Sequence, residues 1–282
     1  MLLTHNDLYG EFQEIGESDI LYEQIQIHNP SGILVQHNIK EAPYYLYRYQ
    51  KHCQNVVEIL YPQTNQISML LDGKEYLIQP KDIFVINPGT VHSPGSPEGV
   101  TQVDTFIVFV DRSWMRYMDR DIAFKEDIIS SISVRKSLDL VIDAYEQGNL
   151  MQQKGSLIYF LVSLEKDGFL TETKHVTADR MIRVLNYINE NYSDFNLSPY
   201  DIALQENISY SHFSREFKQT MGVSFKSYLT RLRLKHSLKD LRYTSLSITE
   251  IALNNGFADV QSLIRACHKL IGMSPGQYRE RF

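Results

Sequence analysis

The spacing of apolar positions in the first part of the chain predicts strands. Between residues 33 and 110, short runs rich in β-branched and aromatic residues are separated by turn signals such as Asp72-Gly73 and Asn87-Pro88-Gly89. Many short strands at this spacing are typical of a sandwich or barrel. The predicted strands cover residues 33–35, 44–49, 56–61, 67–71, 75–78, 83–86 and 105–110.

The apolar period changes to that of helices near residue 127. From there to residue 167, apolar side chains recur three and four positions apart on both sides of Gly148-Asn149, beginning with Ile128 and Ile129. This pattern predicts two antiparallel helices that cover one flank of the strands. Residues 168–177 have no pattern after Leu170 and are interpreted as a linker. We therefore predict an α+β protein of two domains, residues 1–172 and 173–282.

The second domain contains an internal repeat. Ser198 to Leu204 match Ser247 to Leu253 in three features: a Ser at the helix start, an acidic residue three positions later and an Ile-Ala-Leu triplet. The Ser and the acidic residue together have the form of a capping box. Each copy continues into a turn, at Asn207 or Gly256, and then into a second helix, expected over residues 209–221 or 259–271. The repeat predicts two helix-turn-helix units on one chain.

The outward face of each second helix carries the candidate DNA contacts. Phe213 and Phe217 are four apart and share an inward face, as do Leu263 and Cys267. In helix-turn-helix units the second helix enters the major groove, where Arg can contact guanine, Gln adenine and apolar groups the thymine methyl. A single such Arg is better explained as a solvated charge, but the duplication favours DNA contact. The predicted DNA-binding residues are Ser211, His212, Ser214, Arg215, Lys218, Val260, Gln261, Ile264, Arg265 and His268. A small partner-protein patch is the alternative for Val260 and Ile264.

The second copy carries a resemblance to a known family. The sequence SITEIALNNGF, followed by R-x-C-x-K-x-x-G-M-S-P-x-Q-Y-R, resembles the C-terminal signature of the AraC/XylS transcriptional regulators. The resemblance covers about residues 176–282 and implies seven helices, with a long helix over residues 225–241 between the two helix-turn-helix units. Leu263 and Cys267 stand where the family generally has Phe, and both stay apolar. The family also implies a homodimer formed through the predicted helical pair, RNA polymerase as a partner, and activation of transcription. Helices that only cap the strands are the alternative.

Charge is divided unevenly between the two predicted domains. Residues 176–282 hold 14 Lys+Arg against 10 Asp+Glu, and subtracting these from the totals of 28 and 34 leaves 14 against 24 in residues 1–175. The net charge of −6 therefore does not argue against a nucleic-acid partner, because only the basic part must meet phosphate. Two cysteines, no N-terminal signal peptide and no apolar stretch of ~20 residues predict a cytoplasmic protein with no membrane partner.

The first domain resembles a cupin. Residues 82–92, DIFVINPGTVH, are similar to the second conserved box of cupin barrels, so a cupin-like β-barrel for sensing is expected. The first box is incomplete, because Gln54 stands where a second His is expected between His52 and Glu58. Gln is a poor ligand for divalent transition metals, so we predict no metal and no cofactor, and an organic ligand held by hydrogen bonds. The predicted ligand-binding residues are Arg48, His52, Glu58, Tyr76, Asn87 and His92. For His92 alone, a strand-end imidazole bonded to the backbone is the alternative.

These observations together predict a sequence-specific DNA-binding transcription regulator that responds to a small molecule and is not an enzyme. The family resemblance, together with 18 tyrosines suited to stacking on sugar rings, makes a sugar or sugar derivative the first candidate effector. Two alternatives stay open. One is a metal-dependent cupin enzyme with a basic appendage, and the other is a regulator controlled by a partner protein.

Overall fold

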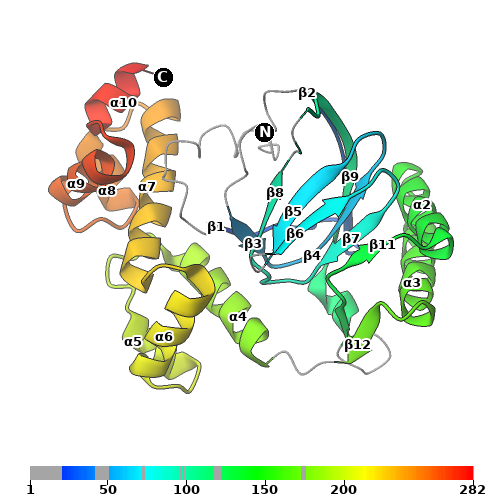
Figure 1. Cartoon of the computed structure of the whole chain (residues 1–282). Coiled ribbons are helices and arrows are strands. Elements are labelled where there is room, and N and C mark those ends of the chain that lie inside the picture. The colour runs from blue at the N-terminus through cyan, green and yellow to red at the C-terminus, as the bar shows by residue number, and fades with distance from the viewer. Residues whose placement is uncertain are drawn as a thin grey trace. The chain divides into compact units, whose positions relative to one another are not determined.

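The computed structural model describes residues 21–41, 51–71, 74–95, 97, 99–116, 122–172 and 176–281. These residues form two compact units, Tyr22–Ile182 and Arg183–Phe282. The first unit is built mainly of strands and the second of helices (Figure 1). The predicted α+β class is confirmed.

Most strands of the first unit belong to two five-stranded sheets. One sheet has the strand order β1-β3-β8-β5-β6 and the other β11-β7-β4-β9-β2, and β10 pairs with β12 in a separate two-stranded sheet. The strands are β1 (Leu21–Glu23), β2 (Ile33–Glu41), β3 (His52–Gln54), β4 (Val57–Pro62), β5 (Ile67–Leu71), β6 (Lys74–Ile78), β7 (Ile83–Ile86), β8 (His92–Gly95), β9 (Gln102–Val110), β10 (Ile122–Phe124), β11 (Ile128–Ile129) and β12 (Leu170–Glu172), with a 3-10 turn at Arg112–Met115.

The two large sheets face each other across an apolar core. Leu60 and Phe84 of the second sheet belong to the same buried cluster as Met69 and Ile78 of the first. Side chains alternate between the two faces of a strand, so Val57 and Ile59 of β4 point the other way. These two residues pack in a second cluster with Leu138 and Phe160 of the helical pair α2 (Ile132–Glu146) and α3 (Leu150–Lys166). The predicted helical pair on the flank of the strands is therefore confirmed.

Two local predictions in this unit are wrong. Ile128–Ile129 form strand β11, paired with β7, and do not begin the helical pair. Leu170–Glu172, assigned to the linker, form β12 and pair with β10. In both places the partner strand lies far away in the sequence, so a local pattern could not reveal the pairing. The predicted strand at 44–49, the turn at Asp72-Gly73 and the candidate residue Arg48 lie outside the described residues.

The second unit contains the two predicted helix-turn-helix pairs. The family resemblance implied seven helices, and seven are present in residues 176–281: α4 (Val176–Asn191), α5 (Pro199–Gln205), α6 (Tyr210–Met221), α7 (Phe225–Tyr243), α8 (Ile248–Asn254), α9 (Val260–Ile271) and α10 (Pro275–Arg281). Ser247 and Glu250 form the expected capping box of α8. In the first copy, Ser198 instead accepts a hydrogen bond from Tyr200 N, where Pro199 occupies the first helical position.

The long helix α7 supplies a core to both copies. Rings of Phe213 and Phe217 on α6 lie against Phe225 of α7, with centroids 6.1 and 5.8 Å apart. In the second copy, Leu263 and Cys267 are fully buried in a cluster with Leu234, Leu238 and Leu241 of α7. The smaller side chains at 263 and 267 are thus accommodated without exposure. None of the described helices is both long and apolar enough to cross a bilayer.

Candidate functional site

The second helices of the two copies, α6 and α9, are fixed by equivalent caps. Ser209 and Asp259 accept hydrogen bonds from His212 N and Ser262 N at the helix starts. Gly222 and Gly272 end the helices with left-handed φ values of 70° and 72°. Hydrogen bonds from Ser262 also hold the pKa of the Asp259 carboxyl below its usual value, so this cap is ionised near neutral pH.

The candidate DNA contacts lie on the surface opposite the buried face of each helix. Phe213, Phe217, Leu263 and Cys267 are at most 1% exposed. Eight of the ten predicted contact residues are exposed: Ser211, His212, Ser214, Arg215, Lys218, Gln261, Arg265 and His268. The structure therefore brings the predicted polar residues together on two equivalent helix faces.

The two apolar candidates, Val260 and Ile264, are half-buried. Val260 packs against the α7–α9 core cluster, which accounts for an apolar residue at this position without a DNA contact. Ile264 lies one turn further along the same face. Of the two, Ile264 is the better candidate for contact with a thymine methyl group.

Arg265 is held in place along its own helix. Its Nη2 donates a hydrogen bond to Ser262 Oγ at 2.9 Å and lies 3.9 Å from Asp259 Oδ1. The side chain is nevertheless 70% exposed. In the first copy His212 Nδ1 lies 3.4 Å from Glu216 Oε2, one turn away. Each helix therefore presents a polar group whose orientation is set before any ligand arrives.

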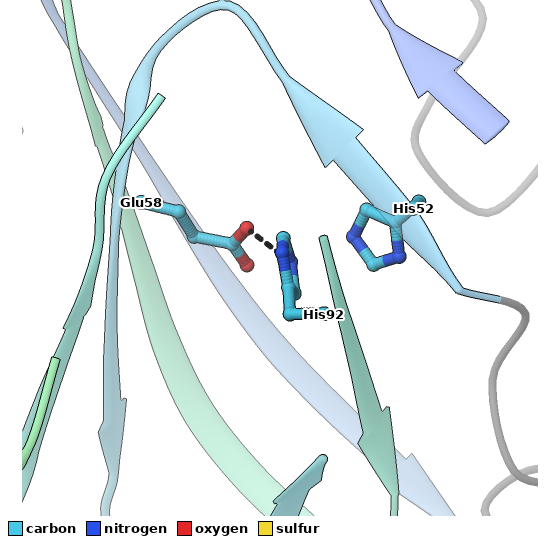
Figure 2. Close-up of side chains that lie close together, drawn as sticks. All are labelled: His52, Glu58 and His92. Atoms are coloured by element: carbon cyan, nitrogen blue, oxygen red, sulfur yellow. Dashed lines mark ion pairs between the residues drawn. The ribbon is translucent and has the colours of Figure 1, made fainter. Parts of the chain in front are cut away.

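Three predicted ligand-binding residues of the first unit lie together between the two sheets (Figure 2). His52, Glu58 and His92 are each at most 5% exposed, and one nitrogen or carboxylate oxygen from each lies within 4.8 Å of the others. Strand pairing explains the arrangement. His52 of β3 is directly opposite His92 of β8, and Glu58 of β4 is on the same face as Leu60, which belongs to the core between the sheets.

Hydrogen bonds orient this cluster. His92 Nδ1 lies 3.0 Å from the carbonyl oxygen of Thr90, and His92 Nε2 lies 3.2 Å from Glu58 Oε2. Gln54 Nε2 donates to the same carboxylate oxygen at 2.8 Å. The ring centroids of His52 and His92 are 4.1 Å apart. Sequence reasoning missed the role of Gln54, although the strand alternation that places residues 52 and 54 on one face could have shown it.

The other predicted ligand-binding residues are engaged elsewhere. The Asn87 side chain donates to Phe124 O at 2.8 Å and accepts from Phe124 N at 2.9 Å, so it ties β7 to β10. Tyr76 packs against Phe84, with ring centroids 4.9 Å apart, and Lys74 Nζ lies 4.1 Å from the Tyr76 ring centroid. We call His52, Glu58 and His92 the histidine–glutamate cluster. Asn87 also donates to Glu126 Oε1 at 3.0 Å, and Glu126 accepts from the hydroxyl of Thr90, so Asn87 is connected to the cluster through these two residues.

The helical unit matches a known family of domains. Residues 202–281 match a family model described as a helix-turn-helix domain, and the structure places two such units, joined by α7, in this range. The C-terminal unit is an AraC-type helix-turn-helix domain. The sequence resemblance is thereby confirmed, and α6 and α9 are the second helices of the AraC-type domain.

Curated relatives share this part of the chain. A helix-turn-helix transcriptional regulator of Staphylococcus aureus (strain MSSA476) is 35% identical over 101 residues, which is 36% of this chain and 13% of the relative. The lactose operon transcription activator of Staphylococcus xylosus is 30% identical over 133 residues, 47% of each protein. The aligned region is thus less than half the length of these relatives.

A solved structure is similar over most of the fold. Fatty-acid-bound ToxT from Vibrio cholerae (strain SCE256) superposes with a TM-score of 0.56 at 14% identity, and the match covers 90% of this chain and 97% of ToxT. The similarity extends beyond the AraC-type domain to the sheet-rich unit. It establishes a shared fold for the two parts.

Proposed function

We propose that this chain is a sequence-specific DNA-binding transcription regulator whose DNA binding is set by an effector held in the sheet-rich unit. The observation that carries the proposal is the duplication of an exposed polar face on α6 and α9, within a domain of the AraC type. Two second helices on one chain can enter two successive segments of the major groove. Activation of transcription is supported by the lactose operon transcription activator among the relatives. RNA polymerase would then be the partner of this chain.

Control by a ligand is supported by the buried polar cluster. Carboxylate and imidazole groups are rarely buried between sheets unless they are paired or bind something. His52, Glu58 and His92 are buried together, and one nitrogen or carboxylate oxygen from each lies within 4.8 Å of the others, so a single ligand could contact all three. A ligand that binds there would change DNA affinity only if it binds the DNA-competent arrangement of the units more tightly than the alternative. A sugar or sugar derivative remains one candidate, since a lactose operon activator is similar to nearly half of this chain.

A homodimer is supported by the outer face of the helical pair. On α3 this face is formed by what we call the α3 stripe: Met151, Gly155, Ile158, Tyr159 and Val162, all exposed. Met151 is 81% and Tyr159 53% exposed, and Ile132 at the start of α2 is 67% exposed. Isologous pairing of two copies is the usual way to cover such a surface, and it would bring four helix-turn-helix units to one operator.

Selection from random duplex DNA by the full-length protein tests the proposal. The selected sequence should bind at least about 1,000-fold more tightly than a base-permuted duplex at the same salt concentration, as measured by fluorescence anisotropy. Equal affinity for all duplexes would overturn sequence-specific regulation. The effector is sought separately by thermal unfolding of the full chain with a sugar panel, where a ligand at 100 times its Kd adds about 2.7 kcal/mol to stability.

A further inference from the structure

The histidine–glutamate cluster has the donor set of a metal site. It offers two imidazole nitrogens and one carboxylate oxygen, and these atoms converge to within 4.8 Å of one another. Ligands on opposite sides of a transition-metal ion are about 4.2 Å apart, given metal–nitrogen and metal–oxygen distances of about 2.1 Å. Shifts of side-chain atoms of less than about 1 Å would therefore bring all three donors onto one ion.

The tautomer of His92 is suited to metal binding. A carbonyl oxygen can only accept, so at the contact with Thr90 O, 3.0 Å away, His92 Nδ1 must carry the proton. This leaves Nε2 as the atom that faces the Glu58 carboxylate, at 3.2 Å. Thr90 is itself anchored, because its hydroxyl donates to Glu126 Oε1 at 2.6 Å. Metal-binding histidines are commonly fixed by such a hydrogen bond from the second ring nitrogen to a backbone carbonyl.

Gln54 completes the surroundings of Glu58. Its Nε2 donates to Glu58 Oε2 at 2.8 Å, as outer residues do for carboxylates that bind metals. Its Oε1 is buried and has no hydrogen-bond partner among the described residues. An ion-bound water molecule would supply the missing donor. The sequence argument against a metal rested on Gln54 being a poor ligand, but in the structure Gln54 supports Glu58 instead of binding an ion.

Apolar residues enclose the three donors. Strand pairing places Ile86 and Phe109 opposite Glu58, and Leu71 opposite His92. All three side chains are buried. Low polarity around a carboxylate strengthens its attraction to a cation and keeps competing water away.

We propose that His52, Glu58 and His92 bind a single divalent transition-metal ion inside the sheet-rich unit. Two imidazoles favour ions such as Zn²⁺, Co²⁺, Ni²⁺ or Fe²⁺ over Mg²⁺ and Ca²⁺, which prefer all-oxygen sites. Three protein ligands leave coordination positions open for water or for an organic effector with an oxygen donor. The inference concerns the sheet-rich unit alone, and only its regulatory meaning rests on the proposed function.

Cobalt titration of the full-length protein, stripped of metal with a chelator, tests this site. The wild type should bind one Co²⁺ per chain with visible d–d absorption, and Zn²⁺ should displace it whereas Mg²⁺ should not. Bound Co²⁺ should also shift the ring-proton NMR signals of two histidines, a readout that needs no variant. The substitutions Glu58→Gln and His92→Gln should each weaken binding by more than the roughly 10–100-fold loss expected for an outer residue, the range expected for Gln54→Ala.

His37→Gln is the matched control. His37 Nε2 pairs with Asp104 Oδ1 at 2.8 Å, a similar imidazole–carboxylate pair, but the His37 side chain is 43% exposed. This substitution should leave the Co²⁺ affinity unchanged. Failure of the wild type to bind Co²⁺, or undiminished binding by both Glu58→Gln and His92→Gln, would overturn the proposal. Absence of sequence-specific DNA binding by both the metal-free and the Co²⁺-loaded protein would contradict the regulator function but not the metal site, because the titration is measured without DNA.

Discussion

Asn207 and Gly256 occupy the same turn position in the two helix-turn-helix copies, and both have positive φ values, 54° and 77°. Their surroundings differ. A Cβ atom at position 256 would lie 2.6 Å from Tyr192 O and 2.8 Å from Ser193 O, which are backbone atoms that cannot easily move. The first copy requires a residue that tolerates the left-handed conformation, whereas the second requires glycine for lack of space as well.

Gly256→Ala should therefore destabilise the AraC-type domain more than Asn207→Ala does. The left-handed conformation costs an alanine about 1–2 kcal/mol at either position, and the clash at 256 adds roughly 1–3 kcal/mol. Denaturant unfolding of the full chain, followed by hydrogen exchange in α8 and α9, measures the difference. Asn207→Gly is the control and should be neutral or mildly stabilising. If the two alanine variants lost the same free energy of unfolding, the backbone around Gly256 would have moved to make room for the added methyl group.

Arg265→Ala tests the assignment of α9 to base contacts. The substitution should weaken binding to the selected DNA by about 1–3 kcal/mol and relax the preference at one base pair. Competition binding against duplexes permuted at each position measures both effects.

Arg242→Ala is the matched control for Arg265→Ala, because it removes the same charge from an exposed position at the end of α7, outside the second helices. It should weaken binding to all duplexes equally or not at all. If Arg265→Ala also weakened all duplexes equally, Arg265 would contact phosphate and not a base.

The sequence predicted the helical unit closely because its signals are local. The second helices were expected over 209–221 and 259–271 and are observed as Tyr210–Met221 and Val260–Ile271, each preceded by its cap. Caps, left-handed turn residues and apolar pairs four apart all act within one or two turns of helix. The resemblance to a known family added the seven-helix arrangement.

The strand unit and its cluster were less predictable because they depend on pairing between distant segments. Strand β8, His92–Gly95, contains Pro94 and a glycine and has no strand signal of its own. It is recognisable only through its partners β3 and β5. The sequence did single out His52, Glu58 and His92, but grouped them with Asn87, which forms hydrogen bonds to Phe124, and with Tyr76, which packs against Phe84. Which side chains of different strands face one another could not be assigned without the register.

Gly155 provides a test of the proposed dimer. It lies in the middle of α3, where glycine costs about 1 kcal/mol relative to alanine, and none of the described residues lies within 4 Å of the position its Cβ would occupy. The described part of the chain gives no steric reason for glycine, whereas a second α3 crossing closely at this point would. Gly155→Ala should raise the stability of the isolated chain by about 0.5–1 kcal/mol and yet weaken self-association, as measured by sedimentation at several concentrations.

Lys154→Ala, next to Gly155 but outside the α3 stripe, serves as the control and should leave self-association unchanged. Ile158→Glu, within the stripe, should give a monomer because it would bury a charge in the contact. A dimer that tolerates both Gly155→Ala and Ile158→Glu would place the interface on another surface.

His236 should make the AraC-type domain sensitive to mild acid. Its ring stacks on Tyr192 with centroids 4.1 Å apart. Burial, with the nearby charges of Lys235 and Lys239, lowers its pKa from 6.5 to about 4. The unfolded chain therefore binds a proton below pH 6.5 that the folded domain does not bind until about pH 4. The contribution of His236 to the free energy of unfolding is therefore highest above pH 6.5 and falls as the pH is lowered toward 4. Between pH 7 and pH 5 the loss should be about 2 kcal/mol.

His236→Phe separates this titration from the other acid effects. Phenylalanine keeps an aromatic ring against Tyr192 but cannot be protonated, so the variant should lose less stability than the wild type between pH 7 and pH 5. Hydrogen exchange of α7 in the full chain, with variant and wild type compared at each pH, measures the local stability and cancels the intrinsic pH dependence of exchange. Parallel pH profiles for the two proteins would mean that His236 titrates with an ordinary pKa in the folded domain and that its burial does not limit stability in acid.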